Sequence, residues 1–114
     1  MNIETIQEVK QYLNDLITIL YEKGYFVYEE TAKKYVDELI DDIQTNLPTK
    51  LHKPAPKYFN NYGKNMKYAG FRKNKHTIWY VFFQTYEKNG ETTYLIRYIA
   101  NNHTIAQYLE EEWD

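Results

Sequence analysis

The sequence predicts an α+β domain. We expect an N-terminal antiparallel helical hairpin packed on a three- to four-stranded antiparallel meander, with a short helix at the C-terminal end. Two observations carry this prediction. In the first half of the chain, apolar residues recur three and four positions apart, the spacing of one helix face. In the second half, runs of β-branched and aromatic residues alternate with turn residues, as in strands.

A chain of 114 residues without internal repeats is expected to form one domain, residues 1–114. Its composition changes along the chain, so we divide it into four parts. These are a helical hairpin (1–47), a basic loop holding all three prolines (48–65), an antiparallel sheet (66–100), and a polar exit with an acidic tail (101–114).

The first amphipathic segment predicts a helix that starts at Ile3. Gly24 follows its last periodic positions, and glycine is common just beyond the end of a helix. Polar residues occupy the rest of the circumference, so a single stripe faces the core. The stripe consists of Ile3, Ile6, Val9, Leu13, Leu16, Ile17 and Leu20.

The second amphipathic segment predicts a helix that ends at Pro48, because the residue before a proline avoids helical angles. Glu29 and Glu30 fall in its first turn, where negative charge complements the helix dipole. The short connector implies an antiparallel hairpin whose acidic outer face is solvated. The apolar stripe consists of Tyr28, Ala32, Tyr35, Val36, Leu39, Ile40, Ile43 and Leu47.

Residues 48–65 show no clear period, and a structureless stretch of this length is usually functional or mobile. Two interpretations remain open. Lysines hold phosphate and aromatic rings stack on unpaired bases, so the loop could bind nucleic acid. Alternatively, its apolar residues pin it to the core and its lysines are only solvated. The residues concerned are Lys50, Leu51, His52, Lys53, Lys57, Tyr58, Phe59, Tyr62 and Lys64.

Strands are expected at 66–73, 76–86 and 92–100. Asn89-Gly90 lies between the last two and tolerates the positive φ angles of a tight hairpin turn. The unbroken apolar run 78–83 indicates a central strand that is covered on both faces.

The last strand ends at Asn101-Asn102-His103, where polar residues abruptly replace apolar ones. Any functional site is expected near this exit. A short final helix is expected from about Thr104, continuing through Glu110-Glu111-Glu112 and Trp113.

Charge is divided sharply along the chain. Residues 1–48 carry a net charge of −6, residues 49–106 carry +8, and residues 107–114 carry −4. A basic half can attract polyanions even though the whole chain is mildly acidic.

Composition excludes several kinds of site. The absence of cysteine excludes disulfides, thiolate zinc sites and cysteine nucleophiles, and the absence of serine excludes serine catalysis. The three histidines lie far apart and the four glycines are isolated, so we expect no metal and no cofactor. No apolar run could span a bilayer and no signal pattern is present, so we expect a cytoplasmic protein without membrane contact.

The order of helix, helix, basic loop, three-stranded meander and polar exit resembles the RelE/ParE toxin superfamily of bacterial toxin–antitoxin systems. The resemblance spans roughly residues 10–108. It is carried by Tyr35–Ile40 in the second helix, Trp79–Phe83 in the middle strand, and Leu95–Ile99 followed by Asn101-Asn102-His103.

The resemblance implies a sheet that cradles RNA on the ribosome and cleaves it as an endoribonuclease, or else a poison of DNA gyrase. In either case a cognate antitoxin would neutralise it, and whether the chain forms a homodimer stays open. Members of the family usually begin with a strand paired to the sheet. Here Met1 and Asn2 leave almost no room for one, so whether a first strand is missing stays open.

The ribonuclease members place basic residues on the sheet and a histidine or tyrosine near the C-terminus. The matching positions, which we take as catalytic candidates, are Arg72, Arg97, His103 and Tyr108. The nucleic-acid-binding candidates are Lys53, Lys57, Lys64, Lys67, Lys73, Lys75, Tyr80 and Tyr98.

Cleavage of RNA through its 2′-hydroxyl needs proton carriers and cations for the phosphorane charge. His103 is the natural proton carrier, since histidine titrates near neutral pH. Arg72 and Arg97, the only arginines, offer the fork geometry that clamps phosphate. Structural roles are the alternatives: Arg97 could pair with a carboxylate of the helical hairpin, and His103 could cap the last helix.

Three functional hypotheses therefore remain. The first is a ribosome-dependent endoribonuclease, and the second is a non-catalytic gyrase poison or degenerate relative on the same fold. The third is an unrelated interaction domain that works through its acidic hairpin.

Overall fold

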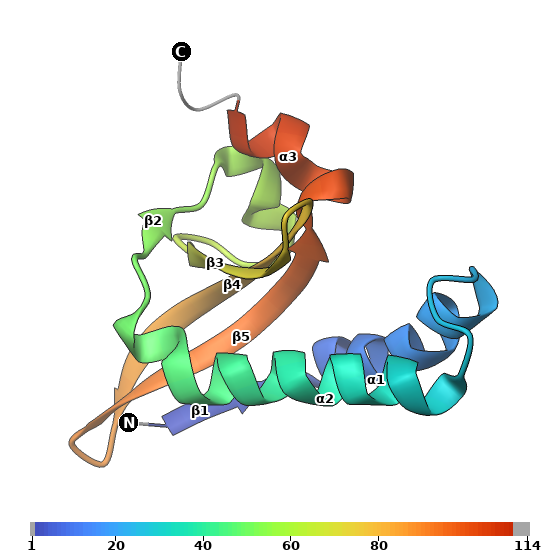
Figure 1. Cartoon of the computed structure of the whole chain (residues 1–114). Coiled ribbons are helices and arrows are strands. Elements are labelled where there is room, and N and C mark those ends of the chain that lie inside the picture. The colour runs from blue at the N-terminus through green and yellow to red at the C-terminus, as the bar shows by residue number, and fades with distance from the viewer. Residues whose placement is uncertain (1, 111–114) are drawn as a thin grey trace.

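The computed structural model describes residues 2–110, excluding the side chain of residue 110. Figure 1 shows the elements in chain order. They are β1 (Asn2–Thr5), α1 (Gln7–Glu22), α2 (Glu29–Asn46), the 3₁₀ helix η1 (Leu47–Thr49), β2 (Lys53–Pro54), the 3₁₀ helix η2 (Lys57–Asn61), β3 (Lys67–Asn74), β4 (Thr77–Lys88), β5 (Glu91–Asn101) and α3 (Asn102–Glu110). The predicted α+β class and the order of the helices are confirmed.

The sheet has five strands in the order β1-β5-β4-β3-β2 and is mixed rather than antiparallel. β1 runs parallel to β5, with Ile3 opposite Tyr94 and Thr5 opposite Ile96. The predicted three- to four-stranded antiparallel meander is confirmed in β2 to β5, whereas the parallel first strand β1 was not predicted and the prediction of a helix starting at Ile3 was wrong. Isoleucine and threonine suit a strand as well as a helix stripe, and pairing with the edge of β5 decides between them.

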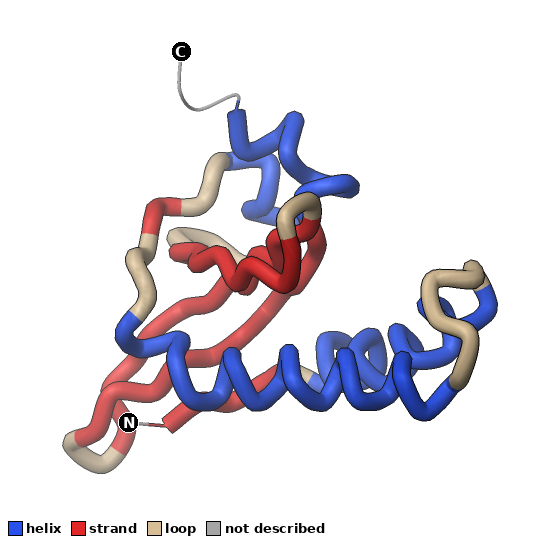
Figure 2. Tube along the Cα trace, viewed as in Figure 1, coloured by secondary structure: helices blue, strands red, loops and turns tan. Residues whose placement is uncertain are grey.

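The predicted helices are otherwise confirmed, and Figure 2 shows them packed side by side. Gly24 ends the first helical segment with a φ of 79°, a left-handed conformation that favours glycine. The basic loop is more ordered than predicted, because it contains η1, β2 and η2. In β2, Lys53 lies opposite Tyr68 of β3.

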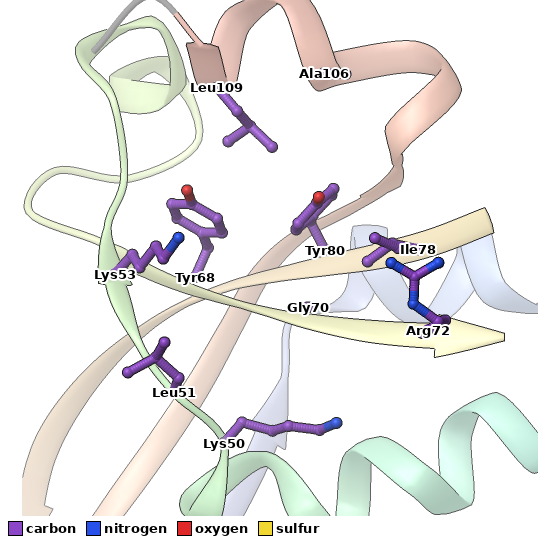
Figure 3. A pocket seen from close by; sticks show the side chains of 10 residues that line it. All are labelled: Lys50, Leu51, Lys53, Tyr68, Gly70, Arg72, Ile78, Tyr80, Ala106 and Leu109. Carbon is purple, nitrogen blue, oxygen red and sulfur yellow. The ribbon is translucent and has the colours of Figure 1, made fainter. Parts of the chain in front are cut away.

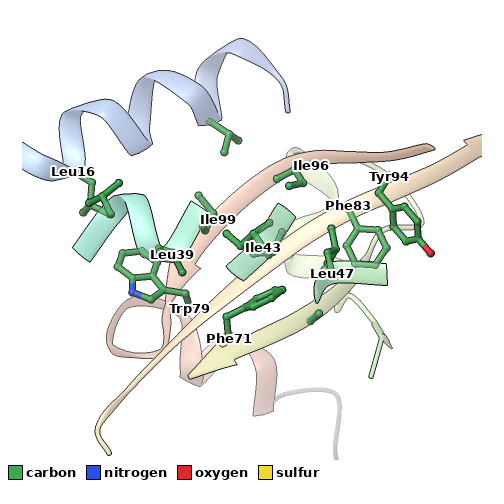
Figure 4. Packing of buried hydrophobic residues seen from close by; sticks show 14 residues of the cluster. Leu16, Leu39, Ile43, Leu47, Phe71, Trp79, Phe83, Tyr94, Ile96 and Ile99 are labelled. Carbon is green, nitrogen blue, oxygen red and sulfur yellow. The ribbon is translucent and has the colours of Figure 1, made fainter. Parts of the chain in front are cut away.

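Two hydrophobic clusters lie on opposite faces of the sheet. The larger cluster packs α1 and α2 on one face and contains Trp79, whose indole nitrogen donates to the Tyr35 hydroxyl at 2.9 Å (Figure 4). The smaller cluster packs η2 and α3 on the other face, through Phe59, Ile105 and Leu109. Neighbouring residues of β4 enter different clusters, which confirms a central strand covered on both faces.

The β4–β5 hairpin turns at Asn89 and Gly90, whose φ angles are 55° and 79°, as the Asn-Gly pair predicts. A bulge interrupts the same pair of strands. Phe82 lies opposite Tyr98, but Phe83 lies opposite Ile96, so Arg97 is the extra residue.

The last helix begins at Asn102, two residues earlier than predicted. Its predicted continuation through residues 111–113 lies outside the described residues. None of the helices between residues 2 and 110 has the length and apolar character needed to cross a membrane.

Candidate nucleic-acid interface

A hollow of about 510 Å³ lies on the face of the sheet that carries α3 (Figure 3). We call it the β3 groove, because alternate residues of β3 line its floor and side chains of α3 line one wall. The segment after η1 and the short strand β2 line the opposite side. The lining residues are Lys50, Leu51, Lys53, Tyr68, Gly70, Arg72, Ile78, Tyr80, Ala106 and Leu109.

The charged residues of the groove are all basic: Lys50, Lys53 and Arg72. Arg72 is held by the β3–β4 turn, since its Nη1 donates to the carbonyl oxygens of Asn74 at 3.3 Å and Lys75 at 3.1 Å. The Lys50 ammonium lies 4.9 Å from the centre of the Phe71 ring. The Arg72 contacts fix a cation in the groove through uncharged carbonyl partners, so the groove can attract an anionic chain, whereas the Lys50 ammonium lies by Phe71 of the cluster on the opposite face.

Two tyrosines stand between the cations. The rings of Tyr68 and Tyr80 meet edge to face, with centroids 5.8 Å apart and planes inclined at 72°. Burial raises the pKa of the Tyr68 hydroxyl, which as a protonated phenol can donate a hydrogen bond. Gly70 makes room for this arrangement, because a Cβ there would lie 3.2 Å from Ile78 Cγ2 and 3.3 Å from Tyr80 Cε1.

The two arginines do not share the groove. Arg97 lines a second hollow of about 490 Å³, and its Nε donates to the Tyr62 carbonyl oxygen at 2.7 Å. Helix α3 separates the hollows, because Ala106 faces the β3 groove whereas Thr104 faces the hollow beside Arg97. Neither arginine forms an ion pair within residues 2–110, so the alternative of an Arg97 pair with the helical hairpin is not realised there.

The polar exit connects α3 to the β3–β4 turn. The Asn102 side chain accepts a hydrogen bond from the Ile78 N–H at 3.0 Å and donates to the His76 carbonyl oxygen at 3.1 Å. His103 is exposed, and its Nε2 lies 3.3 Å from Thr77 Oγ1. Thr77 and Ile78 are successive strand residues, so His103 contacts the side of β4 that faces away from the groove.

Tyr108 is also apart from the other catalytic candidates. Its ring stacks on the ring of Tyr58, with centroids 3.7 Å apart and planes inclined at 6°. Arg72, Arg97, His103 and Tyr108 thus have four separate surroundings, and the described residues do not assemble them into one catalytic centre.

The remaining binding candidates are spread over the surface. Lys64 and Lys67 line a third hollow of about 310 Å³ beside β4. Lys73 faces the helices, 3.8 Å from a carboxylate oxygen of Glu38 and 4.9 Å from the centre of the Tyr35 ring. The other candidates are Lys57 in η2, Lys75 in the β3–β4 turn, and Tyr98, which stacks on Tyr62 at 3.8 Å.

Of the ten residues that line the groove, only Lys53, Arg72 and Tyr80 were among the predicted site residues; Lys50, Tyr68 and Gly70 are among those that were missing. A signal for two of them was present, because Tyr68, Gly70 and Arg72 alternate along β3 and must share one face. The position of Lys50 depends on the path of the loop, which the sequence does not specify. No group of three or more histidine, aspartate and glutamate side chains in the described chain could hold a metal ion.

Comparison of the chain with protein-family models, curated proteins and solved structures found no significant match.

Proposed function

We propose that this protein binds single-stranded RNA in the β3 groove and acts as a RelE/ParE-like toxin of a toxin–antitoxin pair, with ribosome-bound mRNA as its target. One observation supports this most directly. The groove combines three cationic side chains with two tyrosines, and no acidic residue of the described chain lines it. Backbone phosphates need cations and unpaired bases need aromatic faces, so this combination fits a single strand.

Each side chain has a distinct role in the proposal. The Arg72 guanidinium, held by the two turn carbonyls, presents its remaining N–H groups to a phosphate. Lys50 lines the rim of the groove, but Figure 3 shows its side chain on the other side of β3 from Tyr68 and Tyr80. Tyr80, which is partly exposed above Gly70, offers a ring face to a base.

The strand β1 also supports the resemblance to RelE/ParE toxins. The family usually begins with a strand paired to the sheet, and β1 fills that role beside β5. The chain then continues through two helices and three consecutive antiparallel strands, as the resemblance implies.

The separation of the four catalytic candidates favours a second candidate function, a non-catalytic toxin that binds its target without cleaving it. Gyrase poisoning belongs to this class. An intact His103 would then be dispensable, because its contact with Thr77 lies away from the groove.

Two assays test the proposal. A fluorescently labelled single-stranded RNA octamer should bind the full chain, and Arg72→Gln should weaken binding about tenfold, as expected for one charge-assisted phosphate contact. It should also reduce the slope of log affinity against log salt by about 0.7. The matched control is Lys33→Gln, since Lys33 is exposed on α2 and pairs with Asp37 at 2.7 Å. Equal effects of the two substitutions would refute binding in the groove.

Expression in bacteria then distinguishes the modes of action. Growth arrest that Arg72→Gln relieves, with cleaved ribosome-bound mRNA, supports the nuclease. Arrest accompanied by a DNA-damage response, with RNA intact, supports gyrase poisoning. If expression causes no growth arrest, the proposal that the protein is a toxin is refuted, and the RNA-binding assay alone then tests the β3 groove.

A further inference from the structure

The hollow beside Arg97 lies along the open edge of a strand. Arg97–Ala100, four consecutive residues of β5, all line it. Successive side chains of a strand point to opposite faces of a sheet. A single hollow can therefore contact four residues in a row only where it lies along the strand's edge.

This edge is the continuation of the position that β1 occupies. β1 pairs with Thr93–Ile96, and the Ile6 N–H donates to the Ile96 carbonyl oxygen at 3.1 Å before the chain turns into α1. From residue 97 to residue 101, no strand of the described chain pairs with β5 on this side. An open strand edge offers unpaired N–H and C=O groups that a further strand can satisfy.

The side chains around this edge form an apolar wall and one basic group. Ile6 and Val9 share the larger cluster with Ile99 of β5, and Ala100 of β5 lies in the cluster on the other face. Arg97 is held in place, because its Nε donates to the Tyr62 carbonyl oxygen and Gly63 packs against it. A Cβ on Gly63 would lie 2.7 Å from that Nε, so only glycine leaves the guanidinium its space.

The terminal nitrogens of Arg97 donate to no acceptor among residues 2–110. A guanidinium fork that is fixed at Nε and open at its end is suited to a carboxylate. Glu8 is also among the residues that line the hollow, which makes it less suited than the β3 groove to a chain of phosphates.

We propose that this edge binds an extended segment of a partner protein, which adds a strand to β5 directly after the end of β1. The segment carries an acidic side chain that pairs with Arg97, and aliphatic side chains that pack on the wall of Ile6, Val9 and Ile99. Strand addition of this kind obtains affinity from backbone hydrogen bonds and specificity from the side-chain pockets.

The interaction goes beyond RNA binding and does not depend on it. Because α3 lies between this edge and the β3 groove, the segment and an RNA strand can occupy the protein at the same time.

The test is an NMR titration of the ¹⁵N-labelled full chain with blocked heptapeptides. Each peptide has glutamate at its centre and valine, isoleucine, leucine or phenylalanine two residues to either side, with threonine between them. Saturable shifts are expected in the amides of residues 6–12 and 97–101. Arg97→Gln should weaken binding about tenfold, as expected for one charge-assisted pair, and Arg97→Lys should weaken it less.

Two controls complete the test. Methylation of alternate backbone nitrogens of the best peptide should abolish binding, because it removes the donors of the ladder. Arg72→Gln should leave peptide binding unchanged. The proposal is overturned if no peptide gives saturable shifts at about 1 mM, a dissociation constant near the limit of specific recognition. Shifts confined to other residues, or equal binding of the methylated peptide, would also overturn it.

Discussion

Asn102→Ala should destabilise the fold by removing the side chain that connects α3 to β4. The Asn102 amide makes two hydrogen bonds with main-chain groups, to the Ile78 N–H at 3.0 Å and the His76 carbonyl oxygen at 3.1 Å. Each hydrogen bond contributes about 1 kcal/mol net, and water can reach the exposed His76. We therefore expect a loss of about 1–2 kcal/mol, equivalent to roughly 4–8 °C in Tm for a domain of this size.

Urea denaturation of the variant and of the natural chain measures this loss, and amide hydrogen exchange shows where it arises. The Ile78 amide should exchange faster in the variant, whereas amides in the α1–α2 hairpin should change only with global stability. Asn60→Ala is the matched control, because Asn60 is exposed in η2 and its side chain makes no hydrogen bond with another described residue. A loss below about 0.5 kcal/mol, the range of ordinary surface substitutions, together with unchanged Ile78 exchange, would refute the role of the amide.

Three further predictions concern Thr93, Glu4 and Tyr98, of which Tyr98 lines the hollow beside Arg97. Thr93→Val should stabilise the protein by about 1 kcal/mol in urea denaturation, because the Thr93 hydroxyl is buried and has no partner among the described residues; a destabilised variant would contradict this. Hydrogen bonds from Tyr86 and Lys88 hold the pKa of the Glu4 carboxyl below its usual value, so their stabilising effect is complete above that value and is lost as pH falls through the lowered pKa. Glu4→Gln should therefore flatten the acid limb of a pH–stability curve, and an unchanged limb would count against the contact. Burial, together with the Tyr62 hydroxyl, raises the pKa of Tyr98, so the stability of the fold should fall as pH rises above 10. Tyr98→Phe should reduce that fall in an alkaline titration followed by circular dichroism.

Local patterns were sufficient for much of the fold. The two helices, the central strand and the β4–β5 turn each depend on residues close in sequence: periodic apolar stripes, an unbroken apolar run and an Asn-Gly pair. The start of the chain was different. Ile3 and Ile6 continue the helical stripe, yet residues 2–5 form β1, because β5 offers them main-chain partners.

The candidate site shows a similar division. Arg72 was predicted as a catalytic residue that holds phosphate and Tyr80 as a nucleic-acid-binding residue, and their place in one groove follows from alternation along paired strands. Strand alternation could not show whether Arg72, Arg97, His103 and Tyr108 meet in one catalytic centre. The Arg97 bulge, the Asn102 connection and the path of α3 separate these residues, and each depends on contacts between distant parts of the chain.

The sequence by itself determined the α+β class, the helical hairpin, the central strand and the concentration of positive charge in the second half of the chain. These properties follow from periodicity and composition, which act over a few residues. Only the tertiary structure decided the parallel first strand, the separation of the two arginines by α3 and the open edge of β5. Those features depend on which backbone groups find partners across the sheet, and a one-dimensional pattern does not contain that information.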